Sequence, residues 1–272
     1  MPETPEISAC ALRPDTAALW QALQHPDVAP LLRGFVLIGG SALTLRIGHR
    51  VSEDLDLAYA EGKLPVLRIP RLMDALTRQG IDCVRQHDVA AEEEFIEAGL
   101  DLGDFQQNFV ALRSVKLTLV SLDHPARKLI SGDAASPLRV ASLDEIFKTK
   151  SLACADRSKT RDWYDLHTLM TEKGYTIADL HNAFVEAGQP SKYDIAKSRM
   201  TSGRPDASDE GYLQVAGRSK PALDAMRDYF EAGFREFEVG SIAGALRLER
   251  EADQQSVSKS RISSRRKRDI ER

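Results

Sequence analysis

The sequence predicts an α/β (α+β) protein, in which a mixed sheet with flanking helices is followed by a helical domain. Two short patterns indicate strands, the apolar run Phe35–Ile38 and the alternating stretch Asp54–Leu57. A third, from Phe109 to Val120, is typical of a hairpin that turns at Arg113-Ser114. Beyond about residue 142 the apolar spacing predicts helices, among them Thr176–Ala187, about Pro221–Glu238 and Ala243–Glu251, and so a helical second domain.

The length of 272 residues fits one large or two modest domains, at about 150 residues per domain. With 42% apolar residues the chain can bury a core, which excludes wholesale disorder. No apolar run approaches the roughly 18 residues of a membrane span, and the first residues do not resemble a signal peptide. We therefore expect a cytoplasmic protein with no membrane partner. The three cysteines, Cys10, Cys83 and Cys154, are too scattered for a disulfide framework or a CxxC metal pair.

Charge is distributed unevenly along the chain. From Asp88 to Asp104 there are seven acidic residues and no Lys or Arg, which predicts a solvated helix face and loop. From Ser258 to Arg272 seven basic residues stand against two acidic ones, although the whole chain has a net charge of −4. Because this end has no apolar periodicity, a disordered tail is expected over 257–272, able to bind phosphate backbones or a partner.

The first strand leads into a candidate anion site. A helix is expected over about Thr16–Leu32, and the strand Phe35–Ile38 after it should end at the turn Gly39-Gly40. Ser41 then has the character of an N-cap that opens a short helix, which Gly48 ends. The unpaired backbone N–H groups and the dipole of that helix attract anions, and glycine lets an anion approach the backbone closely.

A pair of aspartates follows on the next strand. Asp54 and Asp56 are two residues apart, so they project from one face of a strand while Leu55 and Leu57 enter the core. Two neighbouring carboxylates repel each other unless a cation lies between them. Hard oxygen ligands of this kind favour Mg²⁺, which commonly keeps water and substrate phosphate as its other ligands. The segment therefore predicts a metal site beside a phosphate site.

Two blocks of residues carry a family resemblance. The first is Gly39-Gly40-Ser41-Ala42-Leu43 with Arg46, Gly48-His49-Arg50 and Ser52-Glu53-Asp54-Leu55-Asp56-Leu57. The second is Lys150, Arg157 and Arg161-Asp162-Trp163-Tyr164-Asp165-Leu166. Together they resemble the AbiEii/AbiGii-type nucleotidyltransferases, which are toxins of bacterial toxin–antitoxin and phage-abortive-infection systems within the DNA polymerase β-like nucleotidyltransferase superfamily. The resemblance extends from about Phe35 to Met170.

The start of the second block also has a physical interpretation. Ser142 and Glu145 form a capping-box pattern that predicts a helix from about Leu143 to Arg157. Lys150 and Arg157 are two turns apart and therefore lie on one face of that helix.

The rest of the block is by itself typical of a salt-bridged helix surface. Arg161 and Asp165 are four residues apart and are expected to pair, with Asp162 on the same side. The neighbouring apolar side chains, Trp163, Tyr164 and Leu166, are expected to pack between domains rather than to stack on a base.

The resemblance implies a role for each residue of the two blocks. Asp54 and Asp56 would hold Mg²⁺, and Lys150 and Asp162 would complete the catalytic group, Asp162 by orienting Lys150 or by supporting the metal. The nucleotide would be bound by Gly39, Gly40, Ser41, Arg46, His49, Arg50, Ser52, Arg157 and Arg161. From the order of the expected elements we infer a nucleotidyltransferase-like α/β domain over residues 1–141 and a helical domain over 142–256, with the active cleft between them.

One position departs from the family pattern. Where relatives carry Lys-x-Asp or Lys-x-Glu on a later strand, this chain has Lys116-Leu117-Thr118. Threonine cannot act as a general base at neutral pH, and Asp123 lies beyond the expected end of the strand. The departure leaves the catalytic step open, although it does not affect nucleotide binding.

The predicted reaction is transfer of a nucleotide from a nucleoside triphosphate (NTP) to an acceptor hydroxyl, with Mg²⁺ as cofactor. The resemblance implies that the acceptor is RNA, with the end of a tRNA as the candidate, and that an antitoxin is encoded next to the toxin. Two alternatives stay open. One is a nucleotidyltransferase that modifies a small antibiotic-like molecule, and the other is a catalytically degenerate nucleotide-binding protein, which Thr118 favours.

Overall fold

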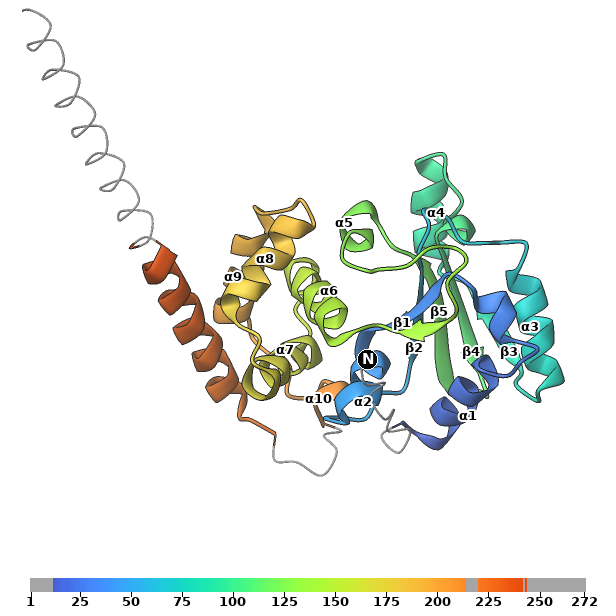
Figure 1. Ribbon diagram of the computed structural model, residues 1–272, viewed down its shortest axis with the longest axis horizontal. Coiled ribbons are helices and arrows are strands. Elements are labelled where there is room, and N and C mark those ends of the chain that lie inside the picture. Colours follow the sequence, from blue (N-terminus) through green and yellow to red (C-terminus); the bar gives the residue numbers. More distant parts are fainter. Residues whose placement is uncertain (1–11, 214–219, 242, 244–272) are drawn as a thin grey trace, which may run out of the picture.

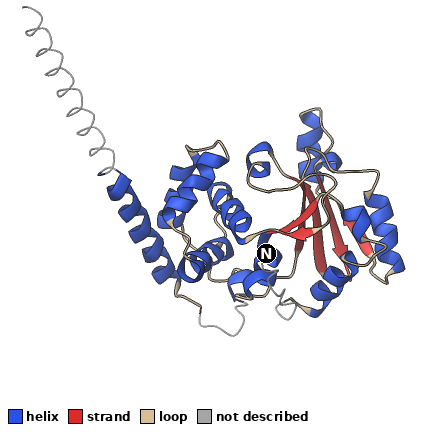
Figure 2. Cartoon of the chain, viewed as in Figure 1, coloured by secondary structure: helices blue, strands red, loops and turns tan. Residues whose placement is uncertain are grey.

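The computed structural model describes residues 12–213, 220–241 and 243, which form two lobes (Figure 1). In Figure 2 the strands gather in one of them, the sheet lobe, which comprises the described residues before 142. The described residues from 142 onward form only helices and their connections, and we call them the helical lobe. A domain boundary at this point stays a prediction.

Within the described part of the chain, six strands form one mixed sheet in the order β3-β4-β5-β2-β1-β6. They are β1 (Phe35–Ile38), β2 (Leu55–Tyr59), β3 (Cys83–Gln86), β4 (Gln106–Ala111), β5 (Val115–Ser121) and β6 (Arg139–Val140). The central strand β2 runs antiparallel to β1 and parallel to β5. This mixed sheet with flanking helices confirms the predicted fold class.

Helices surround the sheet and make up the second lobe. In the sheet lobe they are α1 (Pro14–Leu23), α2 (Gly39–Ile47), α3 (Ile69–Arg78), α4 (Val89–Glu97) and α5 (His124–Arg127), with 3₁₀ turns at Ala29–Leu32 and Leu102–Asp104. In the helical lobe they are α6 (Leu143–Asp156), α7 (Thr160–Lys173), α8 (Ile177–Glu186), α9 (Lys192–Ser202), α10 (Glu210–Leu213) and a helix over residues 223–241. Helix α2 lies where the lobes meet, because it contacts both β1 and α6 (Figure 1).

The first helix is shorter than the sequence pattern predicts. The expected helix over Thr16–Leu32 is wrong in its second half, since α1 ends at Leu23 and only a 3₁₀ turn follows at Ala29–Leu32. Pro26 explains the break, because proline lacks an N–H donor and disfavours helical geometry at the residue before it. The apolar positions were predicted correctly, and Leu19 is fully buried in the core.

The acidic segment forms an exposed helix, as predicted. Helix α4 has no buried residue, and Asp88 caps it by accepting a hydrogen bond from the backbone N–H of Ala91 at 3.2 Å. Its carboxylates are therefore solvated at the edge of the sheet lobe, away from the junction of the lobes (Figure 1).

Local sequence signals explain most of the helical lobe. The predicted capping box opens α6, with Ser142 accepting from the N–H of Glu145 and the Glu145 carboxylate accepting from the N–H of Ser142. The helices predicted over Thr176–Ala187 and Pro221–Glu238 correspond to α8 and to the helix over residues 223–241. Helix α9 falls where the sequence analysis predicted none.

Some expectations fall on parts of the chain that the structure does not describe. These are the basic tail over 257–272, Cys10, and the helix expected over Ala243–Glu251, of which only residue 243 is described. Over the described ranges, no helix combines the length and the apolar character that crossing a lipid bilayer requires.

Candidate active site

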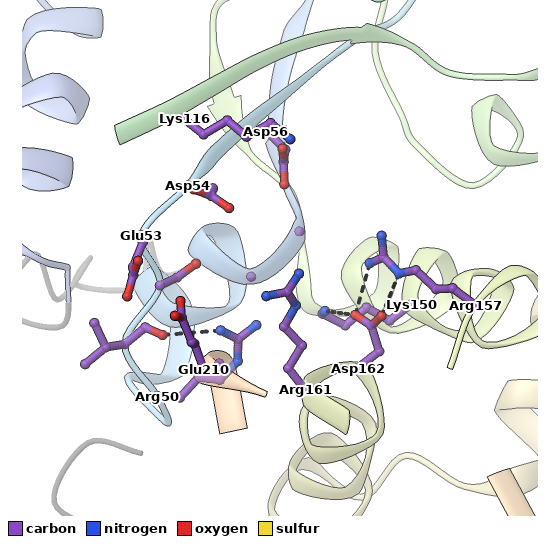
Figure 3. Close-up of a pocket in the computed structure, with 15 residues that line it drawn as sticks. Arg50, Glu53, Asp54, Asp56, Lys116, Lys150, Arg157, Arg161, Asp162 and Glu210 are labelled. Atoms are coloured by element: carbon purple, nitrogen blue, oxygen red, sulfur yellow. Dashed lines mark hydrogen bonds and ion pairs between the residues drawn. The ribbon is translucent and has the colours of Figure 1, made fainter. Parts of the chain in front are cut away.

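A polar cavity with a volume of about 230 Å³ opens between the two lobes (Figure 3). The sheet lobe contributes the start of α2, the segment that leads into β2, one residue of β2 and one residue of β5. The helical lobe contributes residues of α6, α7 and α10, and Arg157 directly after α6. The lining residues are Gly39, Gly40, Arg50, Val51, Ser52, Glu53, Asp54, Asp56, Lys116, Lys150, Arg157, Arg161, Asp162, Glu210 and Gly211.

Helix α2 starts directly after β1, without the predicted turn. Its N-cap is Ile38 rather than Ser41, so the first turn of the helix includes Gly39 and Gly40. The helix ends at Gly48, which has a φ of +59°, as predicted. Because Ile38 offers no side-chain acceptor, the first N–H groups of α2 have no side-chain cap, and the two glycines at this end of the helix line the cavity.

Both glycines are required by the close packing around them. Gly39 has a φ of +73°, and a Cβ atom there would lie 2.9 Å from Oδ2 of Asp56. A Cβ atom on Gly40 would lie 2.5 Å from Nη2 of Arg50 and 3.0 Å from Oγ of Ser52. The glycine pair therefore lets a carboxylate and a guanidinium approach the helix backbone within one turn.

Side chains of α2 hold the segment that carries the first aspartate. Ser41 donates a hydrogen bond to the backbone carbonyl of Asp54 and lies 3.0 Å from Oγ of Ser52. Thr44, one turn later, donates to the backbone carbonyl of Arg50 at 3.0 Å. Ser41 thus has a structural contact in place of the predicted capping role, and it positions Asp54 through the backbone carbonyl of that residue.

Asp54 and Asp56 share one wall of the cavity, and Figure 3 shows both carboxylates on it. Leu55 and Leu57 are fully buried on the other face of β2, so the predicted alternation is confirmed. Burial raises the pKa of Asp54, and the neighbouring carboxylate of Asp56 raises it further. A divalent cation would relieve both effects, so this pair of oxygen ligands suits Mg²⁺.

The residues that neighbour Asp56 across strands β5 and β4 are uncharged. Thr118 on β5 is the direct neighbour of Asp56, and Asn108 on β4 is the neighbour of Thr118. Asp123 caps α5 by accepting from the N–H of Ala126 at 2.9 Å and does not line the cavity. Over the described residues, no group of three or more His, Cys, Asp or Glu side chains is arranged to bind a metal ion.

A buried ionic cluster joins the lobes behind the cavity. Asp165 on α7 is fully buried and accepts hydrogen bonds from Nε and Nη2 of Arg50, at 2.7 and 2.9 Å. Nε2 of His49 lies 2.6 Å from the same carboxylate, and the His49 ring stacks on Tyr164 with a centroid distance of 5.6 Å. The predicted pair between Arg161 and Asp165 is therefore wrong, because buried cations from both lobes occupy Asp165.

Lys150 links this cluster to the cavity wall. Its ammonium lies 3.0 Å from Asp162 and 2.5 Å from Asp165, and Asp162 also binds Nε of Arg157 at 2.8 Å. The Lys150 side chain is only 7% exposed, whereas Arg157 is 53% exposed and faces the opening. Asp162 thus holds Lys150 in place, which is the geometry expected for an orienting carboxylate.

The charges of this cluster are set by mutual pairing. Burial alone would lower the pKa of Lys150 and of Arg50, but the nearby carboxylates of Asp165 and Asp162 together outweigh it, so both pKa values are raised. Burial dominates at His49, whose pKa is lowered despite Asp165, so the ring is neutral at pH 7. The pKa of Asp165 is held well below its usual range, against the effect of burial, by Arg50 and Lys150. Paired cations and anions therefore stay charged inside the junction.

Most of the residues predicted for nucleotide binding or catalysis line the cavity, but three do not. Ser41 supports Asp54, and His49 is buried against Asp165. Arg46 donates to the backbone carbonyls of Ala141 and Val140, both at 2.8 Å, on the far side of β1. The structure therefore gives Arg46 a contact that connects α2 to β6 and to the residue after it, just before the helical lobe begins.

Sequence reasoning missed several residues of the cavity. Lys116 lies two residues before Thr118 on the same face of β5, a spacing that could have indicated it. Glu210 and Gly211 come from α10, which is too short to leave a periodic signal. Gly211 packs on Arg161, because a Cβ atom at position 211 would lie 2.7 Å from Cδ of Arg161.

Comparison with known proteins assigns this arrangement to a family. The family model described as "Nucleotidyl transferase AbiEii toxin, Type IV TA system" matches residues 21–237, which include most of both lobes and every residue of the cavity. The chain belongs to the AbiEii nucleotidyltransferase toxin family. This confirms the predicted nucleotidyltransferase toxin of a toxin–antitoxin system. Membership of the AbiEii family also implies a nucleotide substrate and an antitoxin.

Individual relatives are distant. A protein of Aquifex aeolicus (strain VF5) without an assigned function is 23% identical over 218 residues, covering 80% of this AbiEii-family chain and 94% of its own. A candidate nucleotidyltransferase from H. pylori aligns with a TM-score of 0.42 and 19% identity, over 82% of this chain and 93% of that one. MenT4, a nucleotidyltransferase toxin from Mycobacterium tuberculosis H37Rv, aligns with a TM-score of 0.39 and 14% identity, over 84% and 85%. The family assignment therefore depends on the match to the AbiEii family model over residues 21–237 and not on these structures.

Proposed function

We propose that the protein transfers a nucleotidyl group from an NTP to a hydroxyl of RNA, with the end of a tRNA as acceptor, and that it needs Mg²⁺. The observation that carries the proposal is the shared cavity of the Asp54 and Asp56 carboxylates and the uncapped start of α2. An anion at the helix start and a cation at the aspartates would lie side by side, which is the pattern of a metal-bound triphosphate.

The residues of the cavity would have different roles, in binding the metal ion or in binding the phosphates. Asp54 and Asp56 would hold Mg²⁺, which neutralises negative charge on the phosphates when it is bound. The N–H groups at Gly39 and Gly40 would bind phosphate oxygens, and the exposed guanidinium of Arg157 would meet the phosphates from the helical lobe.

Lys150 and Asp162 would support the reaction at the back of the cavity. Since Asp162 and Asp165 hold the ammonium of Lys150, it presents a fixed positive charge to the reacting phosphate and need not reorganise. Arg50, Ser52 and Arg161 complete the nucleotide-binding wall.

In the reaction, the acceptor oxygen bonds to the α-phosphorus while the bond from that phosphorus to the bridging oxygen breaks, and pyrophosphate leaves. The hydroxyl proton passes to solvent, because the neighbour of Asp56 on β5 is Thr118 and not a carboxylate. A rate limited by loss of this proton would increase with pH.

The test uses purified full-length protein with each of the four labelled NTPs, Mg²⁺ and total tRNA. We expect label to enter the RNA only with Mg²⁺, and Asp56→Ala to abolish transfer. Asp74→Ala removes an exposed carboxylate outside the cavity and serves as the matched control. Transfer that survives Asp56→Ala would refute the assignment of the site.

The Thr118 neighbour of Asp56 favours a second candidate, a nucleotide-binding protein without catalysis. This candidate predicts NTP binding in calorimetry and no release of pyrophosphate with any acceptor. Modification of a small hydroxyl compound in place of tRNA would instead indicate an antibiotic-type transferase. The cytoplasm, where tRNA and NTPs occur, is the location that the proposal requires.

A further inference from the structure

The wall of the cavity that carries Asp54 and Asp56 has few carboxylates for a reaction that commonly uses two metal ions. Along the sheet, the residues beside Asp56 are Thr118 and then Asn108, and neither side chain is charged at neutral pH. Thr118 is only 8% exposed, so its hydroxyl stays next to Asp56. Across β2, β5 and β4, these neighbouring positions thus provide one carboxylate, that of Asp56, whereas a site for two metal ions needs carboxylates that bridge both ions.

The other acidic residues of the cavity either form ion pairs or lie in the opposite lobe. Glu53 forms an ion pair with Arg13 at 2.5 Å. Asp162 is held between Lys150 and Arg157. Glu210 lies on α10, in the opposite lobe from the aspartate pair. Asp54 and Asp56 are therefore the carboxylates that can meet an ion on the sheet wall.

Lys116 adds a positive charge to this same wall. Leu55 pairs with Leu117 in the parallel register of β2 and β5, which places Lys116 beside Asp54. Lys116 and Thr118 are two residues apart on β5 and share the face that borders the cavity. Its ammonium forms no ion pair with any residue that the structure describes, and Figure 3 draws it on the wall with both aspartates.

These placements matter because two divalent ions in one site lie about 3.5–4 Å apart and repel strongly. Carboxylates that bridge them offset the repulsion, and a fixed ammonium beside them increases it. With two aspartates and one lysine, the wall has the charge to bind one divalent ion and too little to bind two.

We infer that the active cavity binds one divalent ion, at Asp54 and Asp56, and that Lys116 supplies beside it the positive charge that a second ion would bring. This inference rests on the proposed function, since it concerns the metal of the same site. It assigns Lys116 to substrate binding, where its ammonium faces the phosphates of the nucleotide or the acceptor.

The number of ions can be measured without turnover. Mn²⁺ replaces Mg²⁺ as a paramagnetic probe, and each of the four α,β-methylene NTP analogues is tested with the full-length protein so that no nucleotide is transferred. Electron paramagnetic resonance then counts bound Mn²⁺ per bound nucleotide, and two ions at about 4 Å reveal themselves by spin–spin coupling. We expect one Mn²⁺ per nucleotide and an uncoupled spectrum.

Two substitutions at one position provide the matched comparison. Thr118→Asp places a carboxylate beside Asp56 and should admit a second, coupled Mn²⁺ at higher concentration. Thr118→Asn introduces a side chain similar in shape to aspartate but uncharged, and it should keep the number of bound Mn²⁺ ions at one.

Lys116→Met should weaken binding of the analogue about tenfold, since it removes a charged contact, while Lys63→Met, outside the cavity, should not.

The outcomes separate this inference from the proposed function. Two coupled ions in the unchanged protein would overturn the inference and leave the nucleotidyltransferase assignment standing. Unchanged affinity in Lys116→Met would remove the role of the lysine. If none of the four analogues binds with Mn²⁺, both the inference and the proposed function fail.

Discussion

Asp165 of α7 and Arg50, from the segment between α2 and β2, form a two-point contact, with Nε and Nη2 of the guanidinium 2.7 and 2.9 Å from the two carboxylate oxygens. Both side chains are buried, at 0% and 5% exposure, and each comes from a different lobe. The same arginine borders Gly40 at the nucleotide-binding wall. The contact that joins the lobes therefore also sets the shape of the candidate active site.

Asp165→Asn should destabilise the fold strongly. The change leaves the buried cations Arg50 and Lys150 without their shared counter-ion, which typically costs about 3–5 kcal/mol of unfolding free energy. Urea denaturation followed by circular dichroism measures the loss. Asp156→Asn disrupts an exposed pair with Lys192 and should cost less than about 1 kcal/mol. Equal losses in the two variants would contradict the role given to the buried cluster.

Gly40→Ala should reduce nucleotide binding and should also lower the stability of the fold, because Arg50 is held by Asp165. The added methyl group would lie 2.5 Å from Nη2 of Arg50, so the guanidinium must move away from the cavity wall. We expect at least a tenfold rise in the dissociation constant for NTP, measured by calorimetry. Gly240→Ala is the control, because nothing lies within 4 Å of a Cβ atom there. Unchanged affinity in Gly40→Ala would show that the helix start does not contact the nucleotide.

Arg46→Met distinguishes a structural role from nucleotide binding. Since the guanidinium donates to the carbonyls of Ala141 and Val140, its loss should cost about 1.5–3 kcal/mol of unfolding free energy. Affinity for NTP should change by less than about twofold. A large loss of affinity at unchanged stability would instead restore the role that the family resemblance implies.

Glu145 should contribute to stability in a pH-dependent way. Burial by itself would raise its pKa, but hydrogen bonds from Arg139 and from the N–H groups of Ser142 and Ser131 outweigh it and lower the pKa from 4.5 to about 2. The folded state thus binds this proton more weakly than the unfolded state. The contribution is complete above about pH 4.5 and is lost as the pH falls towards 2.

The measurement for Glu145 compares unfolding free energies of the unchanged protein and Glu145→Gln at pH 7 and at pH 3. The difference between them should be smaller at pH 3. A difference that does not depend on pH would show that the carboxylate is not stabilised in the folded state. The control is Asp144→Asn, which changes the exposed carboxylate next to Glu145 in the sequence.

Several local patterns in the sequence predicted the structure correctly, although the N-cap expected at Ser41 lies at Ile38. The alternation of Asp54–Leu57 correctly placed both aspartates on one face, and the capping box at Ser142 correctly placed the start of α6. The resemblance drew attention to Thr118 on a later strand, and the sheet places it directly beside Asp56. Other predictions failed, since α1 ends at Leu23, where a proline outweighed the apolar periodicity, and since α9, β3 and β6 were not predicted.

The sequence by itself determined the strands β1, β2, β4 and β5, the end of α2 at Gly48, the aspartate pair and the family, because each is encoded by neighbouring residues. Only the tertiary structure decided which charges meet. Arg161 and Asp165 have the spacing of a helix pair, yet Asp165 binds Arg50, 115 positions away. A buried carboxylate must find cations that are also buried, and burial depends on the packing of the two lobes, which no local spacing reveals.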